Sequence, residues 1–512
     1  MVTFEWIIGL LLAAVALSAL AQRLGVPYPT FLAVGGALLA FLPASPSWVL
    51  DPKLALALFV APVLMDAAYD TSLRDLRANW LPISALVIAA VGVTTVAVLV
   101  HFLLPDMSWP AAIALGAIVA PPDAAAATAV LRQVNLPYRI MKILEGESLL
   151  NDASALLIYR IAVSAEAARH LGWGEFTSSI SLVLLGSLVA GYLCGKLWLI
   201  AAPRFADAPS AIILQFVGTF TVWIVAEHLG LSGILTIVVY AMMLARYAPE
   251  GMSAALRVPT YAVWETAVFI LNVLAFIMIG LQLGPIWSRL DDTVRWQYCE
   301  IAACVLAAVI LARAAWIAIF RIGLRIAVAL ERWRGSQTLV MPSFKSGIVV
   351  AWCGMRGIVT LATAFALPED FPYRDLILFT AFAVVLGSLV LQGVTLRPLI
   401  LALRLKEDDF VANEVARARG AAFRAALAEI DGDPSEEAEL VRLEYRAVLR
   451  QAKDDPDGRI TSSELPADPL RRRAILAARR AILELRQSEA IGDDAFHQIE
   501  EEHARAELGA RG

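Results

Sequence analysis

Charge is scarce in this chain of 512 residues. Only 17% of the residues are charged and 59% are hydrophobic, whereas a typical soluble domain is about a quarter charged and about half apolar. This composition excludes an ordinary soluble globular protein and favours a chain that crosses a membrane many times. The formal net charge of −5 is less informative, because the positions of Lys and Arg orient a membrane protein.

Cysteine and histidine are scarce as well. The four cysteines and five histidines are scattered, and none has the short spacing of a zinc or haem site. We therefore expect the cysteines to be core residues, and we expect neither a resident cofactor nor a nucleic-acid partner.

Long apolar runs dominate what is present. A helix needs roughly 17–25 apolar residues to cross a bilayer, and by this rule we expect an all-α membrane protein with about thirteen transmembrane helices. They lie near residues 5–21, 27–43, 54–69, 80–103, 111–131, 141–165, 178–200, 209–228, 231–247, 261–283, 299–320, 346–367 and 376–397. The first run lacks the basic flank of a signal peptide, so we expect it to remain as the first helix.

The basic residues orient this arrangement. With an odd number of spans, the N-terminus outside and the C-terminal tail in the cytoplasm, the inner loops hold most of the loop Lys and Arg residues, as the positive-inside rule requires. We predict a multi-pass protein of the cell (inner) membrane, with a transmembrane domain at residues 1–404. Residues 405–512 form a soluble tail with amphipathic helices at 410–430, 436–451 and 470–486, and its role is either structural or regulatory.

Polar groups interrupt the apolar runs at three places, and the first is Pro121-Pro122-Asp123. Consecutive prolines remove two backbone donors and free carbonyl groups in the preceding turn. Broken helices of this kind line polar cavities in transporters. Asp123, directly after the break, gives a cation a carboxylate beside bare carbonyls. The alternative is a packing kink with a buried, protonated acid.

The second place is the stripe Glu147-Ser148-x-x-Asn151-Asp152. In a helix, Glu147 and Asn151 lie on one ridge and Ser148 and Asp152 on the next, with the carboxylates about 7.5 Å apart along the axis. Charges inside a bilayer are costly and usually functional, and hard cations prefer oxygen ligands. A carboxylate here can hold either a proton or a cation, which is the physical basis of antiport. A structural network between helices is the alternative.

The third place is Gly354-x-Arg356-Gly357, where the glycines permit local unwinding. A buried guanidinium needs a partner, so we expect a structural ion pair in the core between Arg356 and Glu147, with Asp66 as second choice. With six spans on each side of a linker, this segment and the Pro-Pro-Asp segment occupy corresponding positions. We therefore expect two inverted six-helix repeats whose broken helices cross near the midplane.

Three further polar residues are weaker signals. Glu265 and Asn272 are seven residues apart, hence on one helix face, and polar helix packing is the alternative to a functional role. Arg160 lies near the outer end of its helix, and we interpret it as a snorkelling side chain.

At these motifs the chain resembles the cation:proton antiporter 1 family, which includes bacterial and archaeal sodium/proton antiporters and animal sodium/proton exchangers. The three motifs carry the resemblance, and the layout of about residues 5–400 agrees with it. The chain is most similar to the bacterial branch with a long cytosolic tail. Many members have a threonine or valine where this chain has Pro122, so the choice among Na⁺, Li⁺ and K⁺ stays open, with Na⁺ as our first expectation.

The resemblance implies a role for each matching residue. Asp152 would be the main carrier of cation and proton, Asp123 and Ser148 would complete the Na⁺ site, and Asn151 would hold its geometry. It also implies a homodimer for sodium transport and pH homeostasis. In it, a mobile six-helix core, formed by spans 4–6 and 11–13, would move against a dimerisation domain to give alternating access.

Only one carboxylate of the pair Asn151-Asp152 can release a proton, so we predict that one proton exchanges for one cation without net charge movement. The alternatives are a Na⁺-driven transporter of an organic solute, a membrane-embedded enzyme that uses Asp and Mg²⁺, and a channel. We do not expect an enzyme, because such chemistry needs acidic clusters in cytoplasmic loops and these loops are basic. A channel needs no titrating carboxylate beside a broken helix.

Overall fold

The fold is taken from a computed structural model. It describes residues 2–42, 52–71, 91–131, 137–167, 173–204, 207–251, 254–333, 343–405, 410–451 and 465–487, and the single residues Arg74, Ile83, Ile460 and Ile499. All regular secondary structure in these residues is helical. The chain divides into two compact units, Met1–Lys406 and Glu407–Gly512, and each is described by itself.

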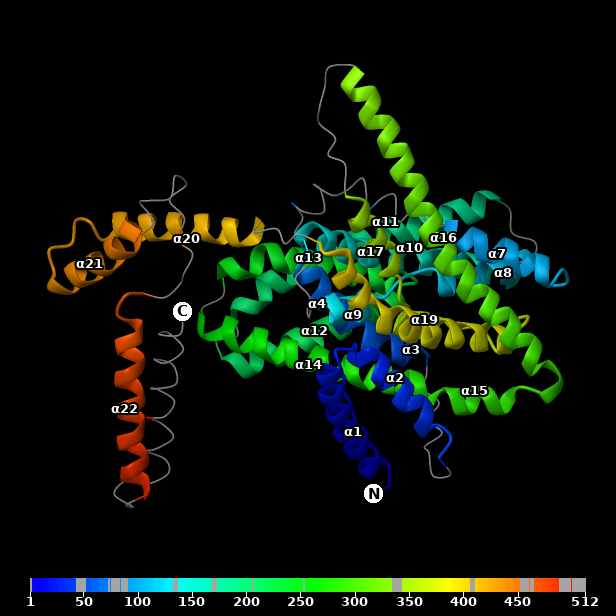
Figure 1. The fold of residues 1–512 in the computed structure, drawn as a ribbon, viewed down its shortest axis with the longest axis horizontal. Coiled ribbons are helices and arrows are strands. Elements are labelled where there is room, and N and C mark those ends of the chain that lie inside the picture. Colours follow the sequence, from blue (N-terminus) through cyan, green and yellow to red (C-terminus); the bar gives the residue numbers. More distant parts are fainter. Residues whose placement is uncertain are drawn as a thin grey trace. The chain divides into compact units, whose positions relative to one another are not determined.

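The first unit is a large assembly of helices (Figure 1). Its first half contains α1 (Val2–Leu24), α2 (Tyr28–Leu39), α3 (Pro52–Ala55), the π-helix η1 (Leu56–Val60), α4 (Ala61–Tyr69), α7 (Val91–Leu103), α8 (Trp109–Val119), α9 (Ala124–Leu131) and α10 (Tyr138–Ala167). Its second half contains α11 (Trp173–Ala201), the 3₁₀-helix η2 (Ala202–Arg204), α12 (Ala208–His228), α13 (Gly233–Gly251), α14 (Ala254–Leu281), α15 (Leu283–Arg289), α16 (Asp292–Trp333), α17 (Phe344–Trp352), α18 (Ile358–Phe365) and α19 (Arg374–Leu403).

The prediction of an all-helical membrane protein is confirmed, and every predicted span overlaps at least one of these helices. Among the described residues, five helices are long and apolar enough to cross a membrane by length and composition, and five other apolar helices are shorter. Residues 80–82 and 84–90, in the predicted fourth span, lie outside the described residues.

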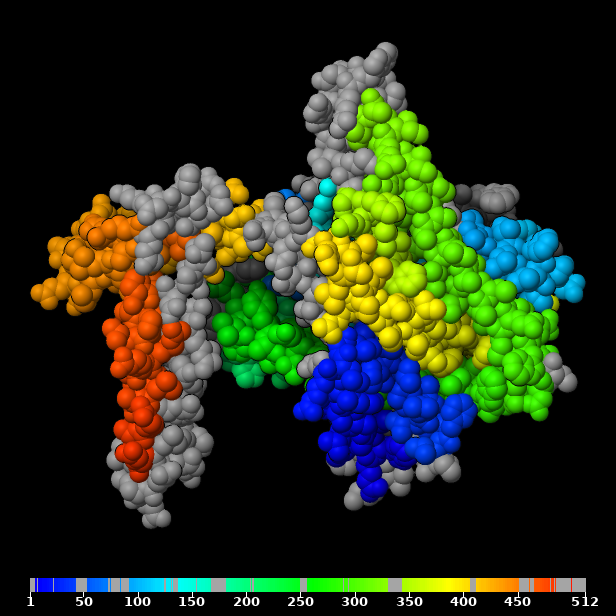
Figure 2. All heavy atoms as spheres, viewed as in Figure 1, coloured from blue at the N-terminus to red at the C-terminus, as the bar shows by residue number. Residues whose placement is uncertain are grey.

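We divide the helices of this unit into two sets, which we call the bundle and the panel, and a large apolar cluster with residues such as Leu32, Phe276 and Phe379 packs the two sets together. The bundle consists of α7–α10 and α16–α19, and one buried apolar cluster joins residues such as Val96, Leu115, Val305 and Leu378 from four of its helices. The panel consists of α1–α4 with η1 and of α11–α15, and a second cluster joins α4, α12, α13 and α14. Figure 2 shows α2 of the panel beside α19 of the bundle, and the two helices are in contact.

Small residues let the panel helices α2 and α14 approach closely. A Cβ on Gly36 would lie 2.3 Å from the carbonyl oxygen of Ile277, and one on Gly280 would lie 2.2 Å from that of Ala33. Such close backbone contact between glycines is a common way for membrane helices to associate. It makes α2 and α14 a tightly packed pair within the panel.

Two bundle helices are broken, as the sequence predicts. The chain leaves helical geometry between Val119 and Ala124, at Pro121-Pro122, and again between Trp352 and Ile358, at the glycine-flanked segment. The two breaks meet, because the backbone N–H of Asp123 donates to the carbonyl oxygen of Met355 at 2.7 Å. The crossing places both motifs at one point inside the bundle.

The second unit contains α20 (Phe410–Glu429), α21 (Glu436–Gln451) and α22 (Asp468–Gln487), within one or two residues of the predicted tail helices. Phe423 of α20 packs edge-on against Tyr445 of α21. Arg471 of α22 donates to both carboxylate oxygens of Glu444 at 2.9 and 3.0 Å. These contacts join the three helices into a small domain.

Candidate functional site

Arg356 neutralises the carbonyl ends of two half-helices at the crossing. Its Nε donates to the carbonyl of Val119 at 2.9 Å and its Nη2 to that of Ala120 at 3.1 Å, while Nη1 donates to Gly354. Its side chain is buried, and its backbone N–H donates to Ser388 Oγ at 3.0 Å. Since the C-terminus of a helix carries partial negative charge, the guanidinium is balanced by the ends of α8 and α17.

Asp123 lies at the opposite kind of helix end. It directly precedes α9, and its carboxylate lies so close to Gly357, at the start of α18, that a Cβ there would be 1.5 Å from Asp123 Oδ2. The N-terminus of a helix carries partial positive charge, so α9 and α18 both stabilise this carboxylate. Glycine at position 357 is required because any side chain would displace the acid.

The expected ion pair between Glu147 and Arg356 is wrong. Glu147 is paired instead with Arg313 of α16, whose Nη2 donates to Oε2 at 2.7 Å and whose Nη1 contacts Oε1. Arg313 also donates to the carbonyl of Val350 at 3.1 and 3.2 Å. Arg356 needs no carboxylate, because the broken helices supply backbone carbonyls as acceptors.

Arg313 was missed by the sequence analysis, although the signal was present. It is the only charged residue between positions 301 and 320 of the predicted span 299–320, and by the argument applied to Arg356 it too required a buried partner. Its pair with Glu147 joins α10, α16 and α17 inside the bundle. Both side chains are almost fully buried, at 9% exposed for Arg313 and 1% for Glu147.

The polar stripe lies on α10, which is an unbroken helix, so its predicted spacing holds. Ser148, Asn151 and Asp152 are all buried. The Ser148 hydroxyl donates to the carbonyl of Pro122 at 3.3 Å, which joins the stripe to the first break. Within the described part of the chain, the Asp152 carboxylate has neither a hydrogen-bond partner nor a counter-ion.

A cavity of about 1340 Å³ reaches this point. Asp123, Ser148 and Asp152 line it from the bundle, and Asp66, Glu265 and Asn272 are among the lining residues on the panel. Asn151, Glu147 and Arg356 are not among the residues that line it. The structure thus brings together Asp123, Ser148 and Asp152 at one cavity and leaves Glu147, Arg356 and Asn151 out of its lining.

The donor set of this cavity suits a transported cation. Carboxylate, hydroxyl and carbonyl oxygens are the ligands that hard cations prefer. The described residues contain no group of three or more His, Cys, Asp or Glu side chains arranged to hold a metal ion.

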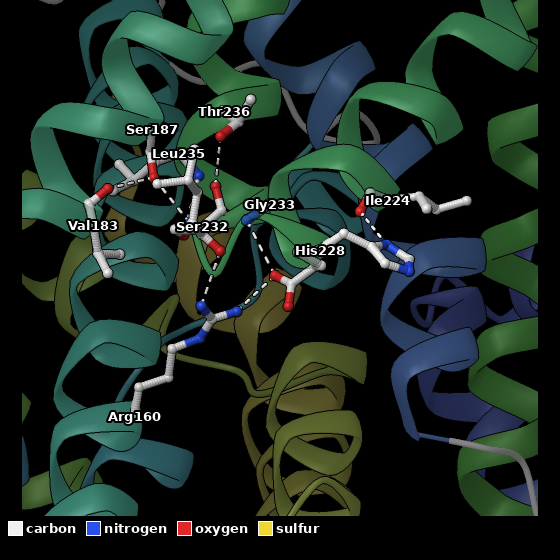
Figure 3. A network of polar contacts seen from close by, with 11 residues as sticks. Arg160, Val183, Ser187, Ile224, His228, Ser232, Gly233, Leu235 and Thr236 are labelled. Atoms are coloured by element: carbon white, nitrogen blue, oxygen red, sulfur yellow. Dashed lines mark hydrogen bonds and ion pairs between the residues drawn. The ribbon is translucent and has the colours of Figure 1, made fainter.

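Arg160 does not extend into solvent as a snorkelling side chain would. Its Nη2 donates to Glu227 Oε1 at 2.6 Å and its Nη1 to the carbonyl of Leu231 at 2.9 Å, and the same Glu227 oxygen accepts the N–H of Gly233 at 3.2 Å. Figure 3 shows Arg160 reaching from α10 toward the turn that precedes α13. A bundle helix is therefore tied to the connection between two panel helices.

Comparison with known proteins agrees with this architecture. Residues 9–402 match the family model described as sodium/hydrogen exchanger, transmembrane. A sodium, potassium, lithium and rubidium/H⁺ antiporter of Bacillus pumilus is 30% identical over 87% of this chain and 69% of its own length. An uncharacterised Na⁺/H⁺ exchanger of Mycobacterium tuberculosis is 30% identical over 96% of this chain and 94% of its own length. The sodium proton antiporter MjNhaP1 of Methanocaldococcus jannaschii has the same fold, with a TM-score of 0.62 at 17% identity, covering 79% of this chain and 99% of that one.

Proposed function

Because the chain belongs to the sodium/hydrogen exchanger family of integral membrane proteins, we propose that it is a secondary antiporter that exchanges a monovalent cation for a proton at Asp152. The observation that carries the proposal is the state of this carboxylate. It is 5% exposed, lines the cavity and has no counter-ion in the described part of the chain. A buried anion of this kind is stable only with a proton or a cation.

Competition at one carboxylate couples the two fluxes. When Asp152 is protonated, the cation loses its charged ligand, and when a cation binds, the proton has left. Asp123 and Ser148 complete the cation site, and Asn151 holds its geometry from behind the cavity wall. Asp152 carries one charge, so one proton leaves for each cation that binds.

The fixed charges near the site support an electroneutral exchange. Glu147 and Arg313 neutralise each other. Arg356 is balanced by the carbonyl ends of α8 and α17, and Asp123 by the amide ends of α9 and α18. Asp152 is then the charge that a proton or a monovalent cation must neutralise. The site therefore has the same net charge with a bound proton as with a bound cation.

The cavity suggests which side of the membrane has access. Its lining includes Asp70, Glu145 and Arg257, which the predicted orientation places at the cytoplasmic ends of their helices. We propose that this is the inward-facing state, with the N-terminus outside and the C-terminal unit in the cytoplasm. The bundle would move against the panel to open the other side, and the panel would form the homodimer contact in the inner membrane.

Na⁺ is the cation we expect first, and Li⁺ and K⁺ are further candidates, since the Bacillus pumilus relative is named a sodium, potassium, lithium and rubidium/H⁺ antiporter. Exchange of these ions for protons would serve pH homeostasis. The C-terminal unit would have a regulatory role, or it would only support the assembly.

The test is proton flux in vesicles containing the purified protein. Na⁺, Li⁺ or K⁺ is added to a preset pH gradient, and a pH-sensitive dye reports its collapse. We expect Asp152→Asn to abolish the cation-dependent response without changing the unfolding temperature greatly. Asp370→Asn, an exposed acid in the connection between α18 and α19, is the matched control and should behave as wild type.

Two results would contradict the proposal. Normal exchange by Asp152→Asn would exclude this carboxylate as the carrier. Cation flux that continues without proton movement would instead indicate a channel. If folded wild-type protein fails to respond to any of the three cations, the organic-solute transporter becomes the better hypothesis.

A further inference from the structure

Asn272 stands out among the polar side chains of α14. This helix lies in a segment with a mean hydropathy of 2.2, so a polar side chain on it that faces a cavity is unusual. Three other polar groups of this helix are bonded: Thr260 donates to Leu256 at 2.7 Å, Thr266 to Ala262 at 2.8 Å and Trp264 to Gln215 at 2.8 Å. (Gln215 belongs to α12.) Glu265 is exposed, whereas Asn272 is half-buried. The Asn272 amide has no hydrogen-bond partner in the described part of the chain.

The surroundings of Asn272 place it opposite the carboxylates. Val268, one turn before it, belongs to the apolar cluster that contains Leu149, the neighbour of Ser148, and against which Ile358 packs. Ala275, three residues after it, belongs to a second cluster that Ile358 also touches. Positions 268, 272 and 275 share one helix face, so Asn272 faces the start of α18, beside Asp123.

The cavity joins these groups. Asn272, Asp123, Ser148 and Asp152 all line it, yet the last three come from the bundle. A dehydrated alkali cation is stabilised by several oxygen ligands, and the panel contributes a neutral carboxamide oxygen at this depth. A neutral ligand adds binding without adding a titrating group.

From these observations, and resting on the proposed antiport at Asp152, we propose that Asn272 is a specificity-determining residue: its side-chain oxygen binds the transported cation from the panel while Asp152 binds it from the bundle. Asn272 thereby sets which monovalent cation is preferred. Because it is uncharged, it leaves the ratio of protons to cations unchanged.

The test compares half-saturating concentrations of Na⁺, Li⁺ and K⁺ for proton flux in wild type and in Asn272→Ala. Loss of one oxygen ligand should raise the half-saturating Na⁺ concentration about tenfold and change the order of preference among the cations. Thr266→Ala is the matched control, because Thr266 lies on the same helix and lines the same cavity but is bonded to its own backbone. It should stay within about twofold of wild type.

Asn272→Asp separates a ligand from a packing role, since it keeps an oxygen at this position with nearly the same volume. We expect Asn272→Asp to bind Na⁺ at least as tightly as wild type. An Asn272→Ala variant with unchanged concentrations for all three cations would overturn the proposal. So would an Asn272→Asp variant as impaired as Asn272→Ala.

A second readout keeps this inference separate from the proposed function. Stabilisation of the detergent-solubilised protein by added NaCl, measured as the rise in unfolding temperature against choline chloride, requires binding but not exchange. If wild type shows no exchange yet is stabilised by Na⁺, and Asn272→Ala is not, the antiport proposal fails and the ligand role of Asn272 stands. If all variants are stabilised equally, the ligand role fails.

Discussion

At the scale of single residues, the bundle depends on a buried pair of opposite charges. Removing one partner of such a pair costs about 3–5 kcal/mol, because the other charge is left buried and uncompensated. We therefore expect Arg313→Ala to lower the unfolding temperature of the solubilised protein strongly. Arg160→Ala is the comparison, since it removes a partly exposed pair worth only ~0–1 kcal/mol.

A matched double variant tests the reason for this loss. Replacing Glu147 and Arg313 together by Gln and Met removes both charges, so the uncompensated charge disappears. We expect this double variant to be more stable than Arg313→Ala alone. If it is less stable, direct attraction within the pair, rather than the cost of a lone charge, dominates.

The positions of individual side chains could be predicted from the sequence only in part. The stripe on α10 follows from helical spacing alone, and the structure confirms that Ser148 and Asp152 reach one cavity. The partner of Arg356 could not be predicted in this way. Two of its three acceptors are backbone carbonyls more than two hundred residues away, and a backbone carbonyl has no signature in the side-chain sequence.

At the scale of elements, the crossing depends on the absence of a side chain at Gly357. We expect Gly357→Ala to displace Asp123 and to abolish cation-dependent proton flux, because the added Cβ overlaps the carboxylate. Flux in reconstituted vesicles, normalised to the amount of folded protein, is the measurement. Wild-type flux would show that Asp123 tolerates displacement.

Gly347 of α17 provides the control in a neighbouring element. A Cβ there would meet Ile317 at an ordinary 3.8 Å. Alanine is favoured over glycine within a helix by about 0.5–1 kcal/mol, so Gly347→Ala should be neutral or slightly stabilising. A loss of flux in Gly357→Ala but not in Gly347→Ala would then reflect the displaced carboxylate at the crossing, and not a general effect of replacing glycine by alanine.

The elements themselves were largely predictable, because an apolar run and a proline pair are local features of the sequence. The helices break at Pro121-Pro122 and at Gly354–Gly357, the positions that the prolines and glycines predicted. The length of α16 was not predicted. It continues to Trp333, beyond the apolar run that ends near residue 320. The prediction followed apolar residues alone, whereas a helix can continue through a sequence that mixes charged and apolar residues.

At the scale of the whole molecule, the two compact units make truncation informative. Unit 1 contains the cavity and all predicted site residues. We expect a chain that stops after Lys406 to fold, as judged by gel filtration, and to keep cation-dependent proton flux. Folded but inactive truncated protein would contradict this expectation, and an altered pH profile with retained flux would indicate regulation by the C-terminal unit.

The contact between Arg160 and the connection of α12 and α13 adds to the free energy needed to move α10 past the panel. Asp152 and Arg160 lie on the same rigid helix, so displacement of α10 past the panel must break both bonds of the guanidinium. Because the Arg160–Glu227 pair is about one-third exposed, water can replace its partners, and the ion pair contributes ~1 kcal/mol at most. Such an energy shifts a two-state population by about fivefold. The C-terminal end of α10 is thus held by a contact that thermal motion readily breaks. In the proposed alternating access, this contact would tune how long each state lasts without trapping either.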